Sequence, residues 1–409
     1  MDESSGWANL HPELLREIAK LMYSYDDYIH LRCICKQWNS SIPRIPDHGN
    51  PWMVLPFDHT FDTHCLEARQ ICHVRVPDIK HSFIRGSSHG YVITVTISDG
   101  TLRMIDPFIK SQFHLPPIST FPNIVSYDPT EDKYTIAEHI FDGGQHYLER
   151  RDKLHTRIID KIIISSPPSD KDFMAVCIYG PDYGLAYCRL GDSEWKDMPH
   201  NEISRCYFQD VIFHGGKIYA TNDKGELHEY DAKTGLPFRG FKTLVTPPDV
   251  PSHELTRKYL VASPEGGLLM VITNQILFRH HEVEIKCDNW TYKFDVYMLN
   301  DNERNQQPTW ASINTLKNYA LVLGYNSSAW MLPNSRFSCG KSNMIYYTDY
   351  QEIGQTFVIG DDNRFHHDIV YLYGGHDNGL VDLDNGLIDR LFPNLPSAPP
   401  VWLLNSHHS

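Results

Sequence analysis

The sequence has no long apolar run. Its longest apolar segments are short, as in residues 161–165, whereas a helix that crosses a bilayer needs about 20 predominantly apolar residues. The first residues, MDESSGWANL, are acidic and polar, unlike the apolar core of a secretory signal peptide. We therefore expect an intracellular protein, cytoplasmic or nuclear, that does not have a membrane as a partner.

Basic residues are fewer than acidic ones. Lys and Arg number 37 against 51 Asp and Glu, which gives a formal net charge of −14. An acidic surface repels phosphate backbones, so nucleic acid is not an expected partner, whereas a protein with a basic patch would be attracted. Hydrophobic residues make up 41% of the chain and charged residues 22%, which is typical of globular chains rather than disordered ones.

The cysteines follow no disulfide framework. They number nine, an odd count, and are irregularly spaced, and a chain of 409 residues can bury a core without disulfides. We therefore predict free thiols. The spacing of Cys33 and Cys35 does not match a zinc half-site, and the His-rich runs at 280–287 and 366–368 would alternate in direction along a strand. We expect no metal and no cofactor.

Helical periodicity stands out at the N-terminus. Pro12 suits the first position of a helix, where its missing N–H costs nothing, and the apolar residues after it fall on one helical face. Asp26 and Asp27 offer an N-cap for a second helix, which would end before Pro43. The two apolar stripes contain Leu14, Leu15, Ile18, Leu21 and Met22, and then Leu31, Ile34, Cys35 and Trp38.

These helices lie within residues 1–45, a unit too small to bury two apolar stripes well. It is either a helical cap on the larger domain or a docking module that completes its core on another protein. The segment 7–43, WANLHPELLREIAKLMYSYDDYIHLRCICKQWNSSIP, resembles an F-box and favours the docking module. The residues that match the family pattern are Trp7, Leu10, Pro12, Leu14, Leu15, Ile18, Leu21, Asp26, Arg32, Cys35, Lys36 and Trp38.

F-boxes bind a Skp-type adaptor, which bridges to a cullin scaffold. The resemblance implies that docking role for six residues, of which Trp38 in particular is also a candidate for the internal core of the unit. His11 departs from the family pattern, in which Leu and Pro are often adjacent. The six residues are Leu10, Pro12, Leu14, Leu15, Ile18 and Trp38.

Residues 50–404 alternate short apolar or aromatic runs with turn residues, as in 91–106 and 211–231. The pair Asp99-Gly100 and the triplet Asp223-Lys224-Gly225 mark hairpin tips between runs of alternating apolar and polar residues. Tyr and Phe, at 23 and 18 copies, favour strands. Because no long segment of helical period interrupts these runs, we expect this part of the chain to be all-β.

A faint internal repeat, Gly-x-Leu followed by Asp, recurs in these hairpins. It is present at 100–106 and 225–231, with a looser match at 379–384, although a common hairpin signature would also arise by chance. Degenerate repeats of short antiparallel strands fit a propeller better than a sandwich. At roughly 45–50 residues per four-stranded blade, residues 50–404 predict about six to seven blades.

Segments along the chain resemble a large plant family that joins an F-box to a kinase-inhibitor-like β-propeller. The match is collinear from Trp7 to about Trp402. Its most specific piece is IDPF…LPP within 105–117, where Asp106 replaces the usual Asn of the family. Some members of that family are propellers that bind protein kinases, and the F-box implies work as a ubiquitin-ligase adaptor.

Catalytic signatures are absent. The glycine pairs, for example 215–216, do not open a helix that carries Lys-Ser or Lys-Thr, so a phosphate loop is not predicted, and there is no Gly-x-Ser-x-Gly elbow. Some propellers are glycosidases with inward carboxylates, a role open in principle to Asp106, Asp231 and Asp384. Hairpin-end Asp residues more often cap turns, so we do not expect an enzyme.

We predict an F-box at 1–45 and a β-propeller at 50–404, forming a substrate-recognition adaptor of a Skp-cullin-F-box ubiquitin ligase. The target protein and its binding residues are unknown from sequence. The alternative is a binding-only propeller, for example a kinase inhibitor, with a vestigial F-box. The polar connection 300–309 and the basic segment 141–157 are candidate surface or recognition loops, and a Gly-Ser bridge in place of 142–153 should leave the melting temperature nearly unchanged.

Overall fold

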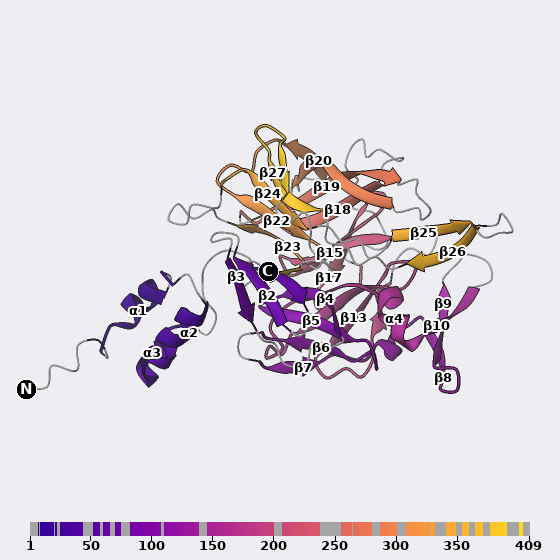
Figure 1. Cartoon of the computed structure of the whole chain (residues 1–409), viewed down its shortest axis with the longest axis horizontal. Coiled ribbons are helices and arrows are strands. Elements are labelled where there is room, and N and C mark those ends of the chain that lie inside the picture. The colour runs from indigo at the N-terminus through magenta and orange to yellow at the C-terminus, as the bar shows by residue number, and fades with distance from the viewer. Residues whose placement is uncertain are drawn as a thin grey trace, which may run out of the picture.

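The computed structural model describes residues 7, 9–19, 21–22, 25–43, 52–57, 60–65, 70–74, 82–107, 110–138, 145–199, 207–237, 255–263, 265–279, 287–300, 308–325, 327–331, 341–348, 354–359, 365–370, 377–390 and 401–403. Three helices precede a long series of strands (Figure 1). The expected mainly β chain with a small helical N-terminal unit is confirmed. The helices are α1 (Pro12–Ala19), α2 (Tyr25–Cys33) and α3 (Lys36–Ser41).

The strands form sheets in which neighbours are mostly consecutive in sequence and antiparallel, as expected where hairpin tips separate short apolar runs. Three sheets use the first half of the chain, with the last strand added to the first sheet. They are β29 (Val401–Leu403), β1 (Trp52–Phe57), β2 (Thr60–Cys65) and β3 (Gln70–Val74); β4 (Ser82–Ser88), β5 (Tyr91–Thr96), β6 (Leu102–Ile105) and β7 (Gln112–His114); and β11 (Ile159–Ile164), β12 (Met174–Tyr179), β13 (Gly184–Arg189) and β14 (Lys196–Asp197).

Three further sheets use the second half. In the last of them β22 and β24 run parallel, whereas the other pairs of that sheet are antiparallel. The three sheets are β15 (Phe208–His214), β16 (Lys217–Asn222) and β17 (Leu227–Asp231); β18 (Leu255–Ala262), β19 (Leu268–Arg279), β20 (Cys287–Asn300) and β21 (Thr309–Ile313); and β23 (Ser328–Met331), β22 (Ala320–Gly324), β24 (Met344–Thr348), β27 (Asn378–Asp382) and β28 (Ile388–Arg390).

These sheets are the blades of a closed ring. The innermost strand of each blade contacts the innermost strand of the next, in the order β29, β4, β11, β15, β18 and β23. The ring closes because the last strand, β29, pairs with β1 in the register Met53 to Trp402 and contacts β4 and β22. Closure of this kind protects sheet edges. The described residues thus form six blades of a β-propeller, within the predicted six to seven.

Two insertions lengthen the chain without adding a blade. They explain why the number of residues per blade is larger than the roughly 45–50 that is usual for a four-stranded blade. The first follows the second blade and ends in a helix. The second lies between β24 and β27 and is a two-stranded hairpin. The insertions contain β8 (Ile124–Asp128), β9 (Lys133–Glu138), β10 (Gln145–Arg150) and α4 (Arg151–Ile158), and then β25 (Gly354–Ile359) and β26 (Phe365–Val370).

The glycines of the sequence repeat have different roles. Gly100 and Gly225 have φ angles of +68° and +77° at the tips that precede β6 and β17, a conformation that favours glycine. Gly379 instead lies inside β27, where an added Cβ would approach the carbonyl oxygen of Asp389 to 2.5 Å. The third match therefore reflects close packing of strands and not a hairpin tip.

The aspartates of the repeat open the turn after the third strand of a blade. The carbonyls of Asp106 and Asp231 each accept a hydrogen bond from the backbone N–H four residues later. After β27 the residue with this pattern is Asp382. The sequence match at Asp384 was therefore wrong by two residues, because the repeat contains too few fixed positions to define its register.

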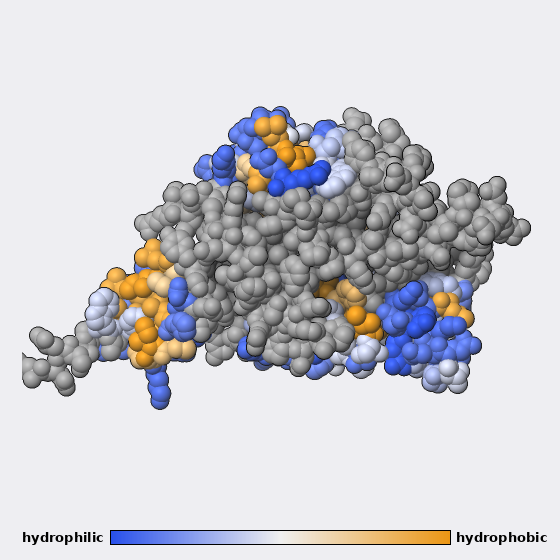
Figure 2. All heavy atoms as spheres, in the orientation of Figure 1, coloured by the Kyte–Doolittle hydropathy of each residue, from blue (hydrophilic) through white to orange (hydrophobic). Residues whose placement is uncertain are grey.

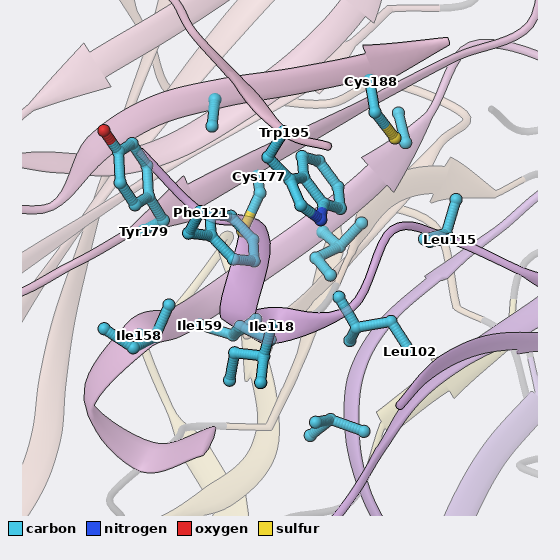
Figure 3. Packing of buried hydrophobic residues seen from close by; sticks show 14 of the residues in the cluster. Leu102, Leu115, Ile118, Phe121, Ile158, Ile159, Cys177, Tyr179, Cys188 and Trp195 are labelled. Carbon is cyan, nitrogen blue, oxygen red and sulfur yellow. The ribbon is translucent and has the colours of Figure 1, made fainter. Parts of the chain in front are cut away.

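A buried apolar cluster joins the second and third blades (Figure 3). Phe121 stacks on Trp195 with ring centroids 4.7 Å apart and on Tyr179 at 5.3 Å. The indole Nε1 of Trp195 donates to the carbonyl oxygen of Pro116 at 2.9 Å. Since buried indoles need a hydrogen-bond partner, the Leu-Pro-Pro motif has a structural role as an anchor between two blades.

Candidate functional site

The apolar residues of α1 divide into an inner and an outer row. Leu15 and Ala19 are buried, whereas Leu14 is 55% exposed. Ile18 is half-buried, and Leu21, in the turn after the helix, is 49% exposed. Residues spaced by four along a helix lie on the same side, so the stripe that the sequence suggested is two adjacent rows. Only the inner row enters a core.

The inner row packs with α2 and α3 in the unit's own core. The Tyr28 hydroxyl donates to the carbonyl oxygen of Pro43 at 2.8 Å, and Trp38 Nε1 donates to that of Trp7 at 3.2 Å. These bonds satisfy the polar atoms of two buried rings. The core cluster contains Leu15, Ala19, Tyr28, Trp38 and Ile42.

The second apolar stripe does not lie on one helix. The chain leaves the helical path at Ile34 and Cys35, and the Cys35 Sγ caps α3 by accepting from the N–H of Trp38 at 3.5 Å. The continuous stripe expected over 31–38 is therefore wrong, and Ile34 is 59% exposed. The pair at 26–27 lies in the first turn of α2 rather than at its cap.

The structure separates the six residues to which the F-box resemblance gave a docking role. Leu15 and Trp38 belong to the buried core, so their side chains are not available at the surface of the unit. Leu14 is exposed and therefore available to a partner. The half-buried members of the set are Leu10, Pro12 and Ile18.

The helical unit also exposes apolar side chains that are not among the six residues with an expected docking role. Trp7 is 76% exposed, and Leu21 and Ile34 are also largely exposed. The first two match the F-box pattern, which was a usable signal, whereas Ile34 becomes exposed only because the helix breaks beside it. Figure 2 shows apolar surface over the helical unit. We call Trp7, Leu14, Leu21 and Ile34 the exposed apolar set.

The basic segment 141–157 is largely ordered structure and not a surface loop. Over its described residues it contains β10, which pairs with β9, and most of α4. Leu154 and Ile158 of α4 are buried in the cluster between the second and third blades. The expectation of a surface loop is therefore wrong for the described residues of 142–153, and we now expect the Gly-Ser bridge to lower the melting temperature, because it would remove a paired strand and the start of this helix.

Two arginines of this segment, among its described residues, pair with carboxylates of the same chain. Arg150 lies 3.1 Å from Asp152, and Arg151 lies 2.9 Å from Asp132. Local pairing lowers the charge available to a partner, so these two arginines offer less free positive charge than the sequence suggested. Residues 301–307 of the other candidate loop lie outside the described residues.

The aspartates considered for a catalytic role lie in separate turns of the propeller. Asp106 and Asp231 lie in turns of different blades, and Asp231 Oδ1 caps its turn by accepting from two backbone N–H groups. The described part of the chain contains no group of His, Cys, Asp and Glu that could hold a metal ion. Residues 280–286, and the side chains at 366–368, lie outside it.

Helices of the described part are also too short or too polar to cross a membrane.

Four cysteines provide a test of the thiol prediction. Cys33, Cys35, Cys177 and Cys188 are free, and the first is exposed. Burial raises the pKa of the Cys177 and Cys188 thiols well above the ordinary value. Since the thiolate is the reactive form, we expect a maleimide to modify Cys33 rapidly in the folded protein and the two buried thiols only after denaturation.

Peptide mass mapping before and after urea treatment measures this difference. Equal labelling of Cys33 and Cys177 in the native protein would contradict the packing of the second and third blades.

Comparison with known proteins agrees with the fold and with the helical unit. F-box protein At4g35733 of Arabidopsis thaliana is 22% identical over 366 residues, covering 88% of this chain and 94% of that protein. F-box protein At2g17036 of the same plant is 23% identical over 435 aligned positions, covering 98% and 96%. The propeller domain of a Cps50 (Swd1) protein has a TM-score of 0.28 at 10% identity and covers 80% of this chain and 96% of its own, a likeness too weak to bear on the fold.

The sequence model of one family, described as the KIB1-4 beta-propeller, matches residues 61–374. The matched span begins in β2 and reaches past β26, so it covers strands of every blade. The expected resemblance to plant F-box proteins with a propeller of this kind is confirmed. The chain belongs to the KIB1-4 beta-propeller family.

Proposed function

We propose that the chain is the substrate-recognition subunit of a Skp-cullin-F-box ubiquitin ligase. In this proposal residues 1–45 dock a Skp-type adaptor, and the propeller at 50–404 holds a target protein. The observation that carries the proposal is the division of α1 into two rows. The inner row serves the unit's own core, and the outer row leaves large apolar side chains in water.

The exposed apolar set is better explained by a partner than by folding. Apolar surface gathers over this small unit (Figure 2), and contiguous exposed apolar surface is typical of interaction sites. Leu14 and Ile34 come from different parts of the unit and have comparable exposure. Each large apolar anchor in an interface contributes about 2 kcal/mol or more, so three or four suffice for stable docking.

The proposed role requires no chemistry from this chain. Ubiquitin transfer would be the work of other subunits, and this protein would contribute proximity between them and a target. An intracellular location, cytoplasmic or nuclear, follows from that role. The net charge of −14 favours targets with a basic surface, because complementary charge accelerates encounter.

Proximity labelling with the full chain fused to a biotin ligase tests the proposal in plant cells. We expect a set of labelled proteins whose amounts rise when the proteasome is inhibited, because targets bound to a working ligase are degraded. The variant Leu14→Asp should label the same proteins without that rise, since its propeller is unchanged and its adaptor contact is lost. If labelling by the wild-type chain does not respond to the inhibitor, the protein is a binding-only propeller.

A further inference from the structure

The break between α2 and α3 contains two cysteines. Cys33 is the last residue of α2, and Cys35 immediately precedes α3. Both thiols are free, and the first is exposed whereas the second is half-buried. They flank Ile34, which is 59% exposed and belongs to the exposed apolar set. A change at either cysteine therefore occurs beside a side chain that is available to a partner.

The backbone of the break allows the two thiols to meet. The chain bends at Ile34, and the backbone at Cys35 is extended, with φ −157° and ψ 168°. Residues i and i+2 have Cα atoms at most about 7 Å apart, and a bend shortens this distance into the range of about 4.4–6.8 Å that a disulfide spans. A Cys33–Cys35 disulfide therefore needs only a local change of the backbone between the two helices.

Reduced Cys35 has a structural role that a disulfide would remove. Its Sγ accepts from the N–H of Trp38 at 3.5 Å and so caps α3, a helix of six residues. A cap of this kind satisfies an N–H that has no partner within the helix. To reach Cys33, the Cys35 side chain must turn away from this N–H. Capping and disulfide formation are therefore alternatives.

The cap affects the surface of the unit because Trp38 joins α3 to the N-terminal segment. Trp38 belongs to the buried core, and its indole Nε1 donates to the carbonyl oxygen of Trp7 at 3.2 Å. Trp7 is 76% exposed. Loss of the cap would loosen the start of α3 and its hold on Trp7, and closure of the disulfide ring would reorient Ile34. Two members of the exposed apolar set would therefore move together.

The residues beside the cysteines suit an anionic oxidant. Arg32 and Lys36 flank the pair in sequence, and Lys36 is exposed. The guanidinium of Arg32 donates to two neutral oxygens of Asn39, which leave its positive charge in place. Glutathione disulfide carries carboxylates, so the two basic side chains attract it.

We propose that Cys33 and Cys35 form a reversible disulfide by exchange with a low-molecular-weight disulfide such as glutathione disulfide. The exposed Cys33 thiolate attacks one sulfur of the reagent and releases one thiolate, which leaves a mixed disulfide. The Cys35 thiolate then attacks the Cys33 sulfur and releases the second thiolate. The two protein thiols lose two electrons, the reagent gains them, and the protons of the protein thiols pass to the released thiolates.

The disulfide lowers the affinity of the helical unit for a Skp-type adaptor, a consequence that rests on the proposed function. Disulfides in reducing compartments are usually transient and redox-sensing, and an exposed disulfide is among the more easily reduced ones. The exchange would therefore link adaptor docking to the state of the glutathione pool.

Peptide mass mapping of the full chain after incubation with glutathione disulfide and alkylation tests the bond. Cleavage by trypsin after Arg32 and Lys36 leaves both cysteines in one tetrapeptide, residues 33–36. We expect this peptide to lose two hydrogens and escape alkylation, and to accept two alkyl groups after treatment with dithiothreitol. A peptide that is only glutathionylated at Cys33, or that stays fully alkylated, would overturn the proposal.

Surface plasmon resonance with immobilised adaptor tests the consequence. The oxidised wild-type chain should bind at least about tenfold more weakly than the reduced chain, as expected when a large apolar anchor is displaced. Cys33→Ser keeps the cap and cannot form the disulfide, so its binding should not respond to glutathione disulfide. Cys35→Ser is the matched variant, because serine is also a good N-cap.

Equal binding by the oxidised and the reduced wild-type chain, or an equal loss of binding by oxidised Cys33→Ser, would overturn this switch. If the reduced wild-type chain does not bind the adaptor, the ligase role is wrong, whereas the disulfide stands or falls by the mass of the tetrapeptide.

Discussion

Replacing Asp210 by alanine is expected to lower the free energy of unfolding by about 3–5 kcal/mol. Its carboxylate accepts from the N–H of Leu260 at 2.7 Å and from that of Val211 at 2.9 Å, and it pairs with Lys161. The side chains of Lys161 and Asp210 are only 3% and 2% exposed. The substitution therefore leaves a buried ammonium group without its counterion and two backbone donors without an acceptor.

The effect is large because Asp210 links three consecutive blades. Lys161 lies on β11, Asp210 on β15 and Leu260 on β18, which are innermost strands of the ring. Urea denaturation followed by circular dichroism measures the change. Lys161→Met should cost less, because the carboxylate keeps both backbone donors, and the double variant Lys161→Met/Asp210→Asn should also cost less than Asp210→Ala. A urea unfolding curve of Asp210→Ala that coincides with that of the wild type would contradict this role.

Leu14→Asp is expected to weaken binding of a Skp-type adaptor by at least about 30-fold. This factor corresponds to the loss of about 2 kcal/mol from one apolar anchor, and the added charge would have to be desolvated in the interface. Because Leu14 is more than half exposed, the three-helix unit should keep its fold. Surface plasmon resonance with immobilised adaptor measures the loss.

Two further leucines serve as controls for Leu14. Leu15→Asp places a charge in the buried core of the unit, so it should abolish binding by unfolding α1–α3, which proteolysis would reveal. Leu236→Asp changes a leucine of the propeller that is also 55% exposed, and it should leave adaptor binding unchanged. Equal binding by Leu14→Asp and Leu236→Asp would remove the outer row from the interface. A substitution that combines Leu14 and Leu15 would confound these two causes.

The division of α1 shows where hydrophobic patterning stops being informative. Spacing identified a helix that begins at Pro12 and an apolar side. Spacing did not distinguish Leu14 from Leu15, because the two leucines are adjacent and equally apolar. Which of them is buried depends on the side of α1 against which α2 and α3 pack. Family resemblance had the same limit, since an F-box pattern contains core and interface positions together.

The insertion after the second blade was misjudged for a related reason. The helix α4 has the sequence RDKLHTRI, in which polar residues predominate. Its apolar signal is the pair Leu154 and Ile158, spaced by four, which is enough to anchor one turn on a large core but too little to stand out from a loop. Charged residues at its start also have partners in the insertion, since Arg151 pairs with Asp132 of the turn between β8 and β9. Sequence spacing does not reveal that contact.

The contacts between the innermost strands could not be predicted from the sequence. Hairpin tips and alternating runs predicted the strands and the propeller, because strand period and turn chemistry are local properties. The contacts of Asp210 join residues about 50 positions away in either direction. Only closure of the ring brings such groups together.

Co-purification of the full chain with a Skp-type adaptor tests the central claim most directly. The wild-type chain and the adaptor, expressed together, should elute from size-exclusion chromatography as one complex, and Leu14→Asp should elute apart from the adaptor at its own volume. Separate elution of the wild-type chain, with α1–α3 shown to be folded by protection from proteolysis, would contradict the docking role of this unit.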